Sequence, residues 1–437
     1  MTATLPRRWR RLAAALALAP GLTGPLAAQT PAADAKADAK PAGATPGVTP
    51  SGTATPLTLA QCLAIGRERQ PLIQAAYHSY RATEVGAKAL GNLGFVAGLV
   101  TPDLPVRRQQ ASRGLTLAAA EIQKVTQENT QDITVLYYSY VYARQQELTA
   151  SDIVEQLEIY YEAAEGIVRS GVRDPKMRLN QFSLYTLQNV ISDVKAQRLK
   201  AETGRKLALE ALRDAMGADG GLDFVPAAKE LPLMLSGTIT QEQVVAEALA
   251  RRPELAQAAA GVDAFRLEVC AQASVKSKRQ VSTLAVGSDL HSKQVPMGVR
   301  NGEYKPGALA PEMPASLVGK TEDRVARAAA LSLRQDALYD RTASLVRLEA
   351  SKAFLTWDAA TRRVVEAKTK YERGRQLVEE SRSAAIAKLD PEILVTNEAL
   401  AGKSQTEYVE AVFDHVKALA ALERITAGGV VTQFPGR

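Results

Sequence analysis

The sequence contains few aromatic residues, few cysteines and few histidines. Phe, Trp and Tyr make up 5% of its 437 residues, and there are two cysteines and three histidines. The histidines, His78, His291 and His415, are far apart and lack metal-ligand spacing, so we expect ordinary surface or helix residues and no metal site. The sequence also lacks a phosphate-binding glycine loop, a nucleophile elbow and a paired-carboxylate motif. We therefore predict no enzyme, no catalytic residue and no cofactor.

No apolar run reaches the roughly 20 residues that a membrane-spanning helix needs. A shorter run from Leu12 to Ala19 follows four arginines between positions 7 and 11, and Leu26-Ala27-Ala28 then offers a cleavage site. This order is typical of a secretory signal peptide, so we predict that residues 1–28 are a cleaved export signal. The alternative, a membrane anchor, needs a longer run.

The chain has little excess charge outside this signal. Its formal net charge is +7, and the four arginines of residues 1–28 leave +3 for the remainder. Nucleic-acid binding needs a clustered basic face, so we predict no nucleic-acid partner. Residues 29–56 are rich in Ala, Pro, Gly and Thr with almost no large apolar side chain, which predicts a disordered tether.

The rest of the sequence contains an internal repeat. Residues 57–90 and 239–272 align without gaps at an offset of 182. Each copy opens with a capping box and a hydrophobic staple, which together predict the start of a helix, and a proline then marks the first turn of a second helix. The residues concerned are Thr58 with Gln61 and Thr240 with Gln243 as capping boxes, Leu57 with Cys62 and Ile239 with Val244 as staples, and Pro71 and Pro253.

A second pair of segments aligns at an offset of 216, which places Asp174-Pro175 on Asp390-Pro391. Asp as N-cap followed by Pro in the first turn predicts a new helix at each dipeptide. Because the offset is larger in the second alignment than in the first, the second copy must contain an insertion. Its connector, roughly 273–320, is therefore longer than that of the first copy, roughly 91–106.

Long periodic segments fill the space between these landmarks. We predict helices from about Leu115 to Val168 and from Pro175 to about Met216, and in the second copy from Asp323 to Ala387 and from Pro391 to about Ala427. At 1.5 Å per residue the first would be about 75 Å long. Helices of this length need a partner, so we predict a mainly α fold of two tandem, antiparallel coiled-coil hairpins.

These signals divide the chain into segments. Glycines at 217, 220 and 221 end the first hairpin, and two prolines keep the following linker irregular. The predicted segments are a signal peptide (1–28), a tether (29–56), repeat 1 (57–216, tip near 170–175), a linker (217–238), repeat 2 (239–430, tip near 387–391) and a tail (431–437).

The two cysteines do not favour an intrachain disulfide. If the copies superpose, Cys62 and Cys270 lie about 26 residues, or ~40 Å, apart along the helix axis. A disulfide needs Cα atoms within about 7 Å. We therefore interpret Cys62 as a staple residue.

Four clustered tyrosines suit either a stacking surface or a seam between helices. The equivalent positions of the second copy, Phe354 and Trp357, are also aromatic, so we favour a buried seam. The tyrosines are Tyr137, Tyr138, Tyr140 and Tyr142.

The order of elements resembles the TolC-like outer-membrane factor family, the outer-membrane efflux proteins. That order is a short capped helix, a proline, a longer helix, a connector, a very long helix, a tip and a return helix, all present twice. The resemblance covers roughly 57–430. The segments that carry it are LTLAQCLAIGRERQPLIQAA, VRSGVRDPKMRLNQFSLYTLQNV near the first tip, GKTEDRVARAAALSLRQDALYDRTASLVRLEASKAFLTW entering the second hairpin and NEALAGKSQTEYVEAVFDHVKALAALERITAGG at the end.

The resemblance implies a homotrimer in the cell outer membrane whose long periplasmic tunnel conducts small molecules or proteins outward. It implies two partners, a periplasmic adaptor (membrane fusion protein) and an inner-membrane transporter. It also implies that the connectors form membrane strands in contact with outer-membrane lipid. Adaptor contact and aperture closure would fall at the two tips. The tip residues are Arg169, Ser170, Gly171, Arg173, Asp174, Lys388 and Asp390.

Two alternatives stay open at this point. The first connector is short, with Pro102 and Pro105 opposing strand pairing, and the second is irregular, so the connectors could be degenerate β segments. The chain would then be a periplasmic helical scaffold or adaptor-binding protein that does not conduct. Arg169 and Arg173 suit either an aperture gate or solvated charges at a helix end, and we favour the second.

Overall fold

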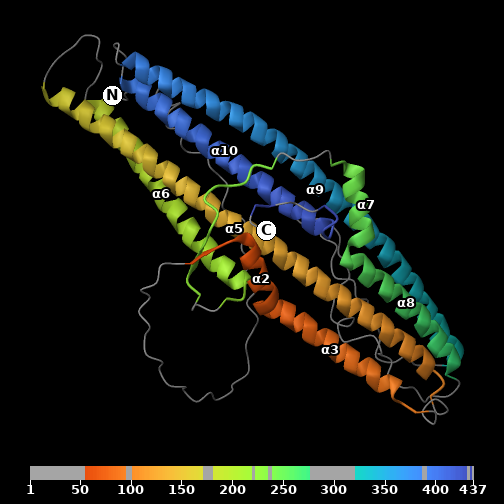
Figure 1. The fold of residues 1–437 in the computed structure, drawn as a ribbon. Helices are drawn as coiled ribbons and strands as arrows, with labels where there is room; N and C mark the ends of the chain where they lie inside the picture. The colour runs from red at the N-terminus through yellow and green to blue at the C-terminus, as the bar shows by residue number, and fades with distance from the viewer. Residues whose placement is uncertain are drawn as a thin grey trace, which may run out of the picture.

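The computed structural model describes residues 55–94, 101–170, 181–218, 222–234, 239–275, 320–385, 391–430 and 434–435. The expected signal peptide, most of the tether and the strands expected in the second connector lie outside these residues. The described part consists of eight helices and two short strands (Figure 1). No helix in it combines the length and apolar character needed to cross a membrane.

The first repeat begins with the strand β1 (Thr55–Leu57) and two short helices, α2 (Leu59–Arg69) and α3 (Pro71–Gly91). A 67-residue helix, α5 (Leu104–Ser170), follows, and α6 (Gln181–Ala215) returns beside it. At 1.5 Å per residue, α5 is about 100 Å long. The mainly α fold of long hairpins is therefore confirmed.

The second repeat has the same order of helices. After the strand β2 (Phe224–Pro226), α7 (Gln241–Arg251) and α8 (Pro253–Ser274) begin where the first offset places the starts of α2 and α3. The long helix α9 (Thr321–Ala385) has 65 residues, and α10 (Pro391–Ile425) begins at the predicted proline. The two offsets found in the sequence therefore relate the helices of one repeat to those of the other.

Both capping boxes are confirmed. The backbone N–H of Thr58 donates to Oε1 of Gln61 over 2.8 Å, and the N–H of Gln61 donates to the Thr58 hydroxyl over 3.3 Å. The second box has the same pair of bonds, at 3.1 and 3.3 Å. The staple residues Cys62 and Val244 are fully buried. Short-range signals of this kind set the helix starts because all the groups involved are within one turn.

The predicted start of the long first helix was wrong. We expected it near Leu115, but α5 begins at Leu104, and only residues 92–103 separate it from α3. The sequence pattern assigns Pro105 to a connector. Proline has no backbone N–H, but in the first turn of a helix that N–H would have no helical partner, so Pro105 is compatible with a helix start. The return helices end at Ala215 and Ile425, each within one turn of its predicted end.

The tether and the linker are more ordered than predicted where they meet. β1 pairs in parallel with β2, with Thr55 opposite Phe224 and Leu57 opposite Pro226. The last residues of the expected tether and part of the expected irregular linker are therefore strand. Tyr137 fixes this pair to α5, because its hydroxyl donates to the Leu57 carbonyl (3.2 Å) and accepts from the Ala228 N–H (3.1 Å).

The helices lie side by side around α5 (Figure 1). On one side of α5 are α3 and α6, placed end to end, and on its other side are α8 and α10. Beyond α8 and α10 runs α9, which contacts both along their length. The molecule therefore has two lateral edges, one made by α3 and α6 and the other by α9.

The main hydrophobic core lies where the short helices α2 and α7 pack on the long ones. Tyr137, Tyr138 and Tyr140 are buried in it together with Trp357, which confirms the predicted aromatic seam. Nothing in the sequence pattern points to Phe434, which is buried in the same core with its ring centroid 5.6 Å from that of Tyr138. Phe434 therefore packs against α5 of the first repeat.

Candidate functional site

The described part of the first tip is the C-terminal end of α5. Arg169 pairs with Glu165 one turn earlier (2.9 Å), and its side chain is 77% exposed. The Ser170 hydroxyl donates to the Ile167 carbonyl and so caps the helix end (2.8 Å). The remaining predicted tip residues lie outside the described residues. These are Gly171, Arg173, Asp174, Lys388 and Asp390.

Sequence reasoning missed two apolar side chains next to this tip. Phe182 and Tyr185, on the first turns of α6, are 49% and 57% exposed. Behind them a separate apolar cluster of α5 and α6, which includes Leu157 and Val190, holds the hairpin together. The described tip therefore presents a basic and two aromatic side chains on a stiff support.

The two lateral edges also present large apolar side chains to solvent. On the first edge, the exposed residues are Leu72 and Val85 of α3 with Leu199 and Leu207 of α6. On the second, they are Leu333, Leu348, Leu355 and Val365 of α9.

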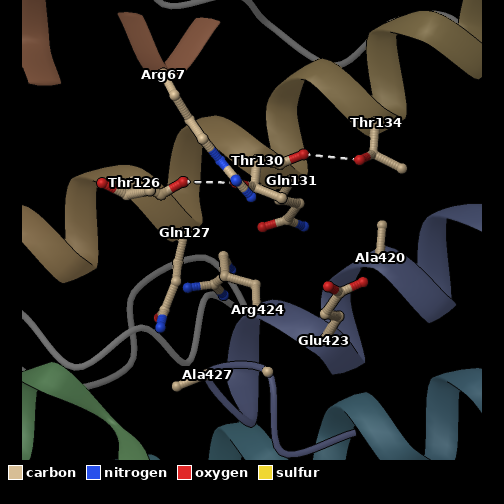
Figure 2. Close-up of a pocket in the computed structure, with 11 residues that line it drawn as sticks. Arg67, Thr126, Gln127, Thr130, Gln131, Thr134, Ala420, Glu423, Arg424 and Ala427 are labelled. Carbon is tan, nitrogen blue, oxygen red and sulfur yellow. Dashed lines mark hydrogen bonds between the residues drawn. The ribbon is translucent and has the colours of Figure 1, made fainter. Parts of the chain in front are cut away.

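A polar cavity of about 150 Å³ lies between α2, α5 and α10. Figure 2 shows Arg67 and Arg424 reaching toward it from opposite sides, with a row of threonines on α5. The hydroxyl of Thr130 donates to the Thr126 carbonyl (2.8 Å) and that of Thr134 donates to the Thr130 carbonyl (2.7 Å). Arg424 is held by Glu349 (2.6 Å). The lining groups are thus largely engaged within the protein, and the cavity is a polar part of the contact between the repeats.

A groove of about 740 Å³ lies where α3 and α6 meet end to end on α5. Its lining includes Leu72, Val135 and the carboxylates of Glu128 and Asp214. Gln70 bridges the two helix ends by donating to the Ala215 carbonyl (3.0 Å). This groove is therefore a gap in the first edge, rimmed by acidic side chains.

A buried ionic cluster joins the helix ends next to the two connectors. Arg107, at the start of α5, donates to Asp103 (3.1 Å), to Gln110 (2.7 Å) and to both carboxylate oxygens of Glu268 near the end of α8. Gln272 links Glu268 to Arg324 at the start of α9, and Arg324 donates to the Val275 carbonyl (2.7 Å). Three helices are thus fixed together at the points where both connectors begin or end.

A second buried ionic cluster lies where α8 and α10 meet α9. Arg252 donates to Glu254 (2.8 Å) and to Glu349 (3.0 Å), which also binds Arg424. Burial alone would lower the pKa of Arg252, but the carboxylates of Glu254 and Glu349 outweigh it and raise the pKa above its ordinary value. The guanidinium therefore stays charged although it is buried.

The histidines and cysteines are dispersed in the structure. His415 is buried, not at the surface, and its ring bonds the Met234 carbonyl (2.9 Å) and the Thr361 hydroxyl (3.2 Å). His78 is exposed, and His291 lies outside the described residues. Both cysteines are free thiols, and burial raises the pKa of Cys62 to about 12. Within the described ranges, no cluster of three or more His, Cys, Asp or Glu side chains is suited to a metal ion.

Comparison with known proteins identifies the fold. No protein-family model and no curated protein sequence matches the chain. Among solved structures, the Neisseria gonorrhoeae MtrE outer-membrane channel in its open state aligns with a TM-score of 0.65 and 13% identity, over 85% of this chain and 89% of that one. The Vibrio cholerae outer-membrane protein VceC aligns with a TM-score of 0.63 and 14% identity, over 85% and 96%.

The Campylobacter jejuni CmeC outer-membrane channel is similar as well, with a TM-score of 0.65 and 8% identity over 86% of this chain and 87% of that one. The chain therefore has the fold of the TolC-like outer-membrane channels, as the order of its sequence elements predicts.

Proposed function

We propose that the chain is a subunit of an exit duct that carries small molecules or proteins outward through the periplasm and the outer membrane. The observation that carries this proposal is a wall of helices about 100 Å long whose two lateral edges both carry exposed large apolar side chains. Copies that pack edge to edge bury both edges at once. A closed ring of walls encloses a passage, and the fold it shares with known channels supports that use.

We further propose that the ring is a homotrimer in the cell outer membrane with a large periplasmic part. The edges differ from each other, so each contact between copies pairs the α9 edge of one with the α3 and α6 edge of the next. Contacts of this heterologous kind form rings when the rotation closes. The duct acts passively, with no catalysis of its own, and an inner-membrane pump supplies the energy.

The tips are the proposed contact with the periplasmic adaptor. The exposed Arg169 at the end of α5, with Phe182 and Tyr185 beside it, offers the mixture of basic and aromatic side chains typical of protein interfaces. The other proposed contact residues are Ser170, Gly171, Arg173, Asp174, Lys388 and Asp390.

The first test is where the native protein fractionates and in what state. We expect it in the outer-membrane fraction, and as a trimer after extraction with mild detergent. Reconstituted in planar lipid bilayers, it should conduct ions in discrete steps. Recovery as a monomer from the soluble periplasmic fraction would refute the duct and favour a helical scaffold.

The second test concerns the tip. Arg169→Glu should lower export of a fluorescent dye from cells without changing the trimer. Arg251→Glu is the matched control, because Arg251 also pairs with a glutamate one turn earlier and is 54% exposed, but it lies on α7, which is far from the tip and belongs to neither edge. Equal effects of the two variants would contradict an adaptor contact at the tip.

A further inference from the structure

We infer that the groove where α3 and α6 meet end to end on α5 is a binding site for an organic cation with an apolar body. This inference goes beyond the proposed duct and does not need it. It rests on the size of the groove, on the charge of its lining and on one buried amide that lines it.

The groove exists because two helices stop short of each other above a third. Gln70 is extended, as a residue before a proline tends to be, so α2 ends at Arg69 and α3 begins at Pro71. On the other side α6 ends at Ala215, and the chain turns away at Gly217 with a positive φ. The helix α5 continues past this gap. The volume of about 740 Å³ lies within the roughly 300–1,000 Å³ typical of small-molecule sites.

All the charge in the lining has one sign. The groove is lined by four acidic residues and by no Lys, Arg or His, although the chain contains more basic than acidic residues. The acidic residues are Glu121, Glu128, Asp132 and Asp214. Charges of one sign in a cleft with apolar walls concentrate the electric field there and attract ions of the opposite sign. The lining therefore selects a positively charged ligand.

Two of these carboxylates are available to such a ligand. Glu121 accepts a hydrogen bond from Gln257 (2.6 Å), and Asp132 also interacts within the protein. Glu128 and Asp214 are exposed, and within the described ranges neither carboxylate makes a hydrogen bond or an ion pair. A cation that enters the groove thus meets two carboxylates that the described part of the chain does not neutralise.

The walls between the carboxylates are apolar. Along α5, Val125 and Val135 follow the acidic positions at three- and four-residue spacing and so share their helix face. Leu136 of α5 and Leu72 and Ala76 of α3 complete these walls. A ligand with an apolar body gains free energy by removing such walls from water, whereas a small hydrated ion does not. The site therefore fits an amphipathic amine better than a metal ion or a polyamine.

The buried side chain of Asn129 points to the same ligand. Asn129 lines the groove beside Gly66 and is 7% exposed, and within the described residues its amide makes no hydrogen bond. A buried amide without a partner is unfavourable, so packing alone favours an apolar residue at this position. The second repeat has one there, because the counterpart at the larger offset is Leu345, which is 2% exposed. A ligand with a polar group supplies the partner that Asn129 lacks.

The second repeat also lacks the acidic part of the site. At the larger offset, the counterparts of Glu128, Asp132 and Asp214 are Ser344, Leu348 and Val430. A structural role that both repeats share therefore does not account for the carboxylates. The site belongs to the first repeat alone.

The groove opens on the edge made by α3 and α6. In the proposed ring this edge meets another copy, and a bound cation neutralises carboxylates that lose water in that contact. The competing occupant is a basic side chain of the neighbouring copy. A groove of about 740 Å³ is far larger than one side chain, which favours a small molecule.

Ethidium is a suitable probe, because it combines an apolar aromatic body with a positive charge and becomes more fluorescent when bound. Titration of the full chain in mild detergent should give saturable binding. Anilinonaphthalene sulfonate, an apolar anion, should not displace the bound ethidium. Spermidine, a cation without an apolar body, should displace it only weakly.

Charge variants locate the binding in the groove. Glu128→Gln with Asp214→Asn should weaken ethidium binding by about tenfold, since each carboxylate contributes a few-fold in affinity. The matched control is Glu155→Gln with Asp193→Asn, which removes one exposed carboxylate from each of the same two helices nearer the tip. The control should bind ethidium as the unmodified chain does.

Two uncharged substitutions test the amide and the space. Asn129→Leu keeps nearly the same shape and should weaken ethidium binding about threefold or more without lowering the melting temperature. A purely structural asparagine would give the reverse, a lower melting temperature with unchanged affinity. Ala75→Trp, an exposed change in the groove lining, should block binding by filling the gap.

The outcomes separate this site from the duct. Absence of saturable binding, equal losses in the groove pair and the control pair, or displacement by spermidine as strong as by an amphipathic amine would each overturn the site. If the chain forms conducting trimers that bind no ethidium, and the groove pair weakens those trimers, the neighbouring copy fills the groove and the duct stands. If ethidium binds as expected but the chain forms no ring, the site stands and the duct fails.

Discussion

Replacing Arg107 with methionine should loosen the ends of three helices at once. Its guanidinium is fully buried and lies between the carboxylates of Asp103 and Glu268, which are also buried. Without the arginine, two buried carboxylates lose the cation that binds them both. Removal of one partner from a buried ion pair typically costs about 3–5 kcal/mol, because the remaining charge is neither solvated nor paired. We expect a cost in that range for opening this end of the structure.

The double variant Arg107→Met with Glu268→Met distinguishes this cause from a simple loss of packing. It removes one of the two orphaned carboxylates, so it should be more stable than Arg107→Met alone by about 1–3 kcal/mol. If loss of packing were the cause, the double variant would be less stable than Arg107→Met, because a second large substitution would disturb the packing further. Arg107→Lys keeps the charge but loses the bidentate contact, and its cost should be smaller than that of methionine.

Hydrogen exchange measures this opening locally and avoids the concentration dependence of an oligomer's global unfolding. In Arg107→Met, amides of residues 104–111 and 264–275 should exchange about 100-fold faster or more, which corresponds to about 3 kcal/mol at about 1.4 kcal/mol per tenfold. Amides around Leu157, in the separate apolar cluster near the tip, provide the internal reference. A change below tenfold, or a double variant less protected than the single one, would refute the reasoning.

Three further predictions concern other parts of the core. Burial lowers the pKa of His415 below its ordinary value of 6.5, so its stabilising contribution is complete above about pH 6.5 and is lost as the pH falls. Lowering the pH from 7.5 to 5 should therefore reduce the free energy of unfolding of the unmodified chain more than that of His415→Asn. Phe434→Ala should lower the free energy of unfolding, measured with denaturant, by about 3–5 kcal/mol, because the ring is buried in the main core. A change close to zero would show that the ring is peripheral. Gly217→Ala should lower the melting temperature clearly more than Gly428→Ala. Both glycines have positive φ, but only at 217 would the new Cβ lie 2.6 Å from the Arg69 carbonyl oxygen. Equal melting shifts would contradict this.

The elements that could be predicted from the sequence are those whose signals are local. The capping box of Thr240, the staple at Val244 and the proline at 253 each act within one or two helical turns, so a single segment of sequence contains the whole interaction. Because the same signals occur once in each copy at a constant offset, the duplicated fold could be predicted as well. The same local reasoning predicts the end of α5 close to Ser170.

Features that join distant segments could not be predicted. The strand Thr55–Leu57 is very short, and its partner, Phe224–Pro226, follows the whole first hairpin in the chain. Arg107 and Glu268 are separated by 161 residues, and each resembles an ordinary surface charge in its own helix. Nothing in the local pattern distinguishes a charge that the fold buries from one that it leaves in water.

Both buried ionic clusters lie inside one chain and not at its free edges, and this placement has a physical reason. Both clusters join α8 to other helices of the same chain, where folding brings the charges together once and keeps them together. On the two free edges, the counterparts of Glu268 and Arg107 at the two sequence offsets are Gly86 and Asp323, and both are exposed. Buried charges at that contact would have to lose water each time copies associate, at a cost of several kcal/mol per ion. Apolar side chains such as Leu333 on the α9 edge gain free energy from the same burial. The difference between the repeats is therefore what a contact between folded copies requires.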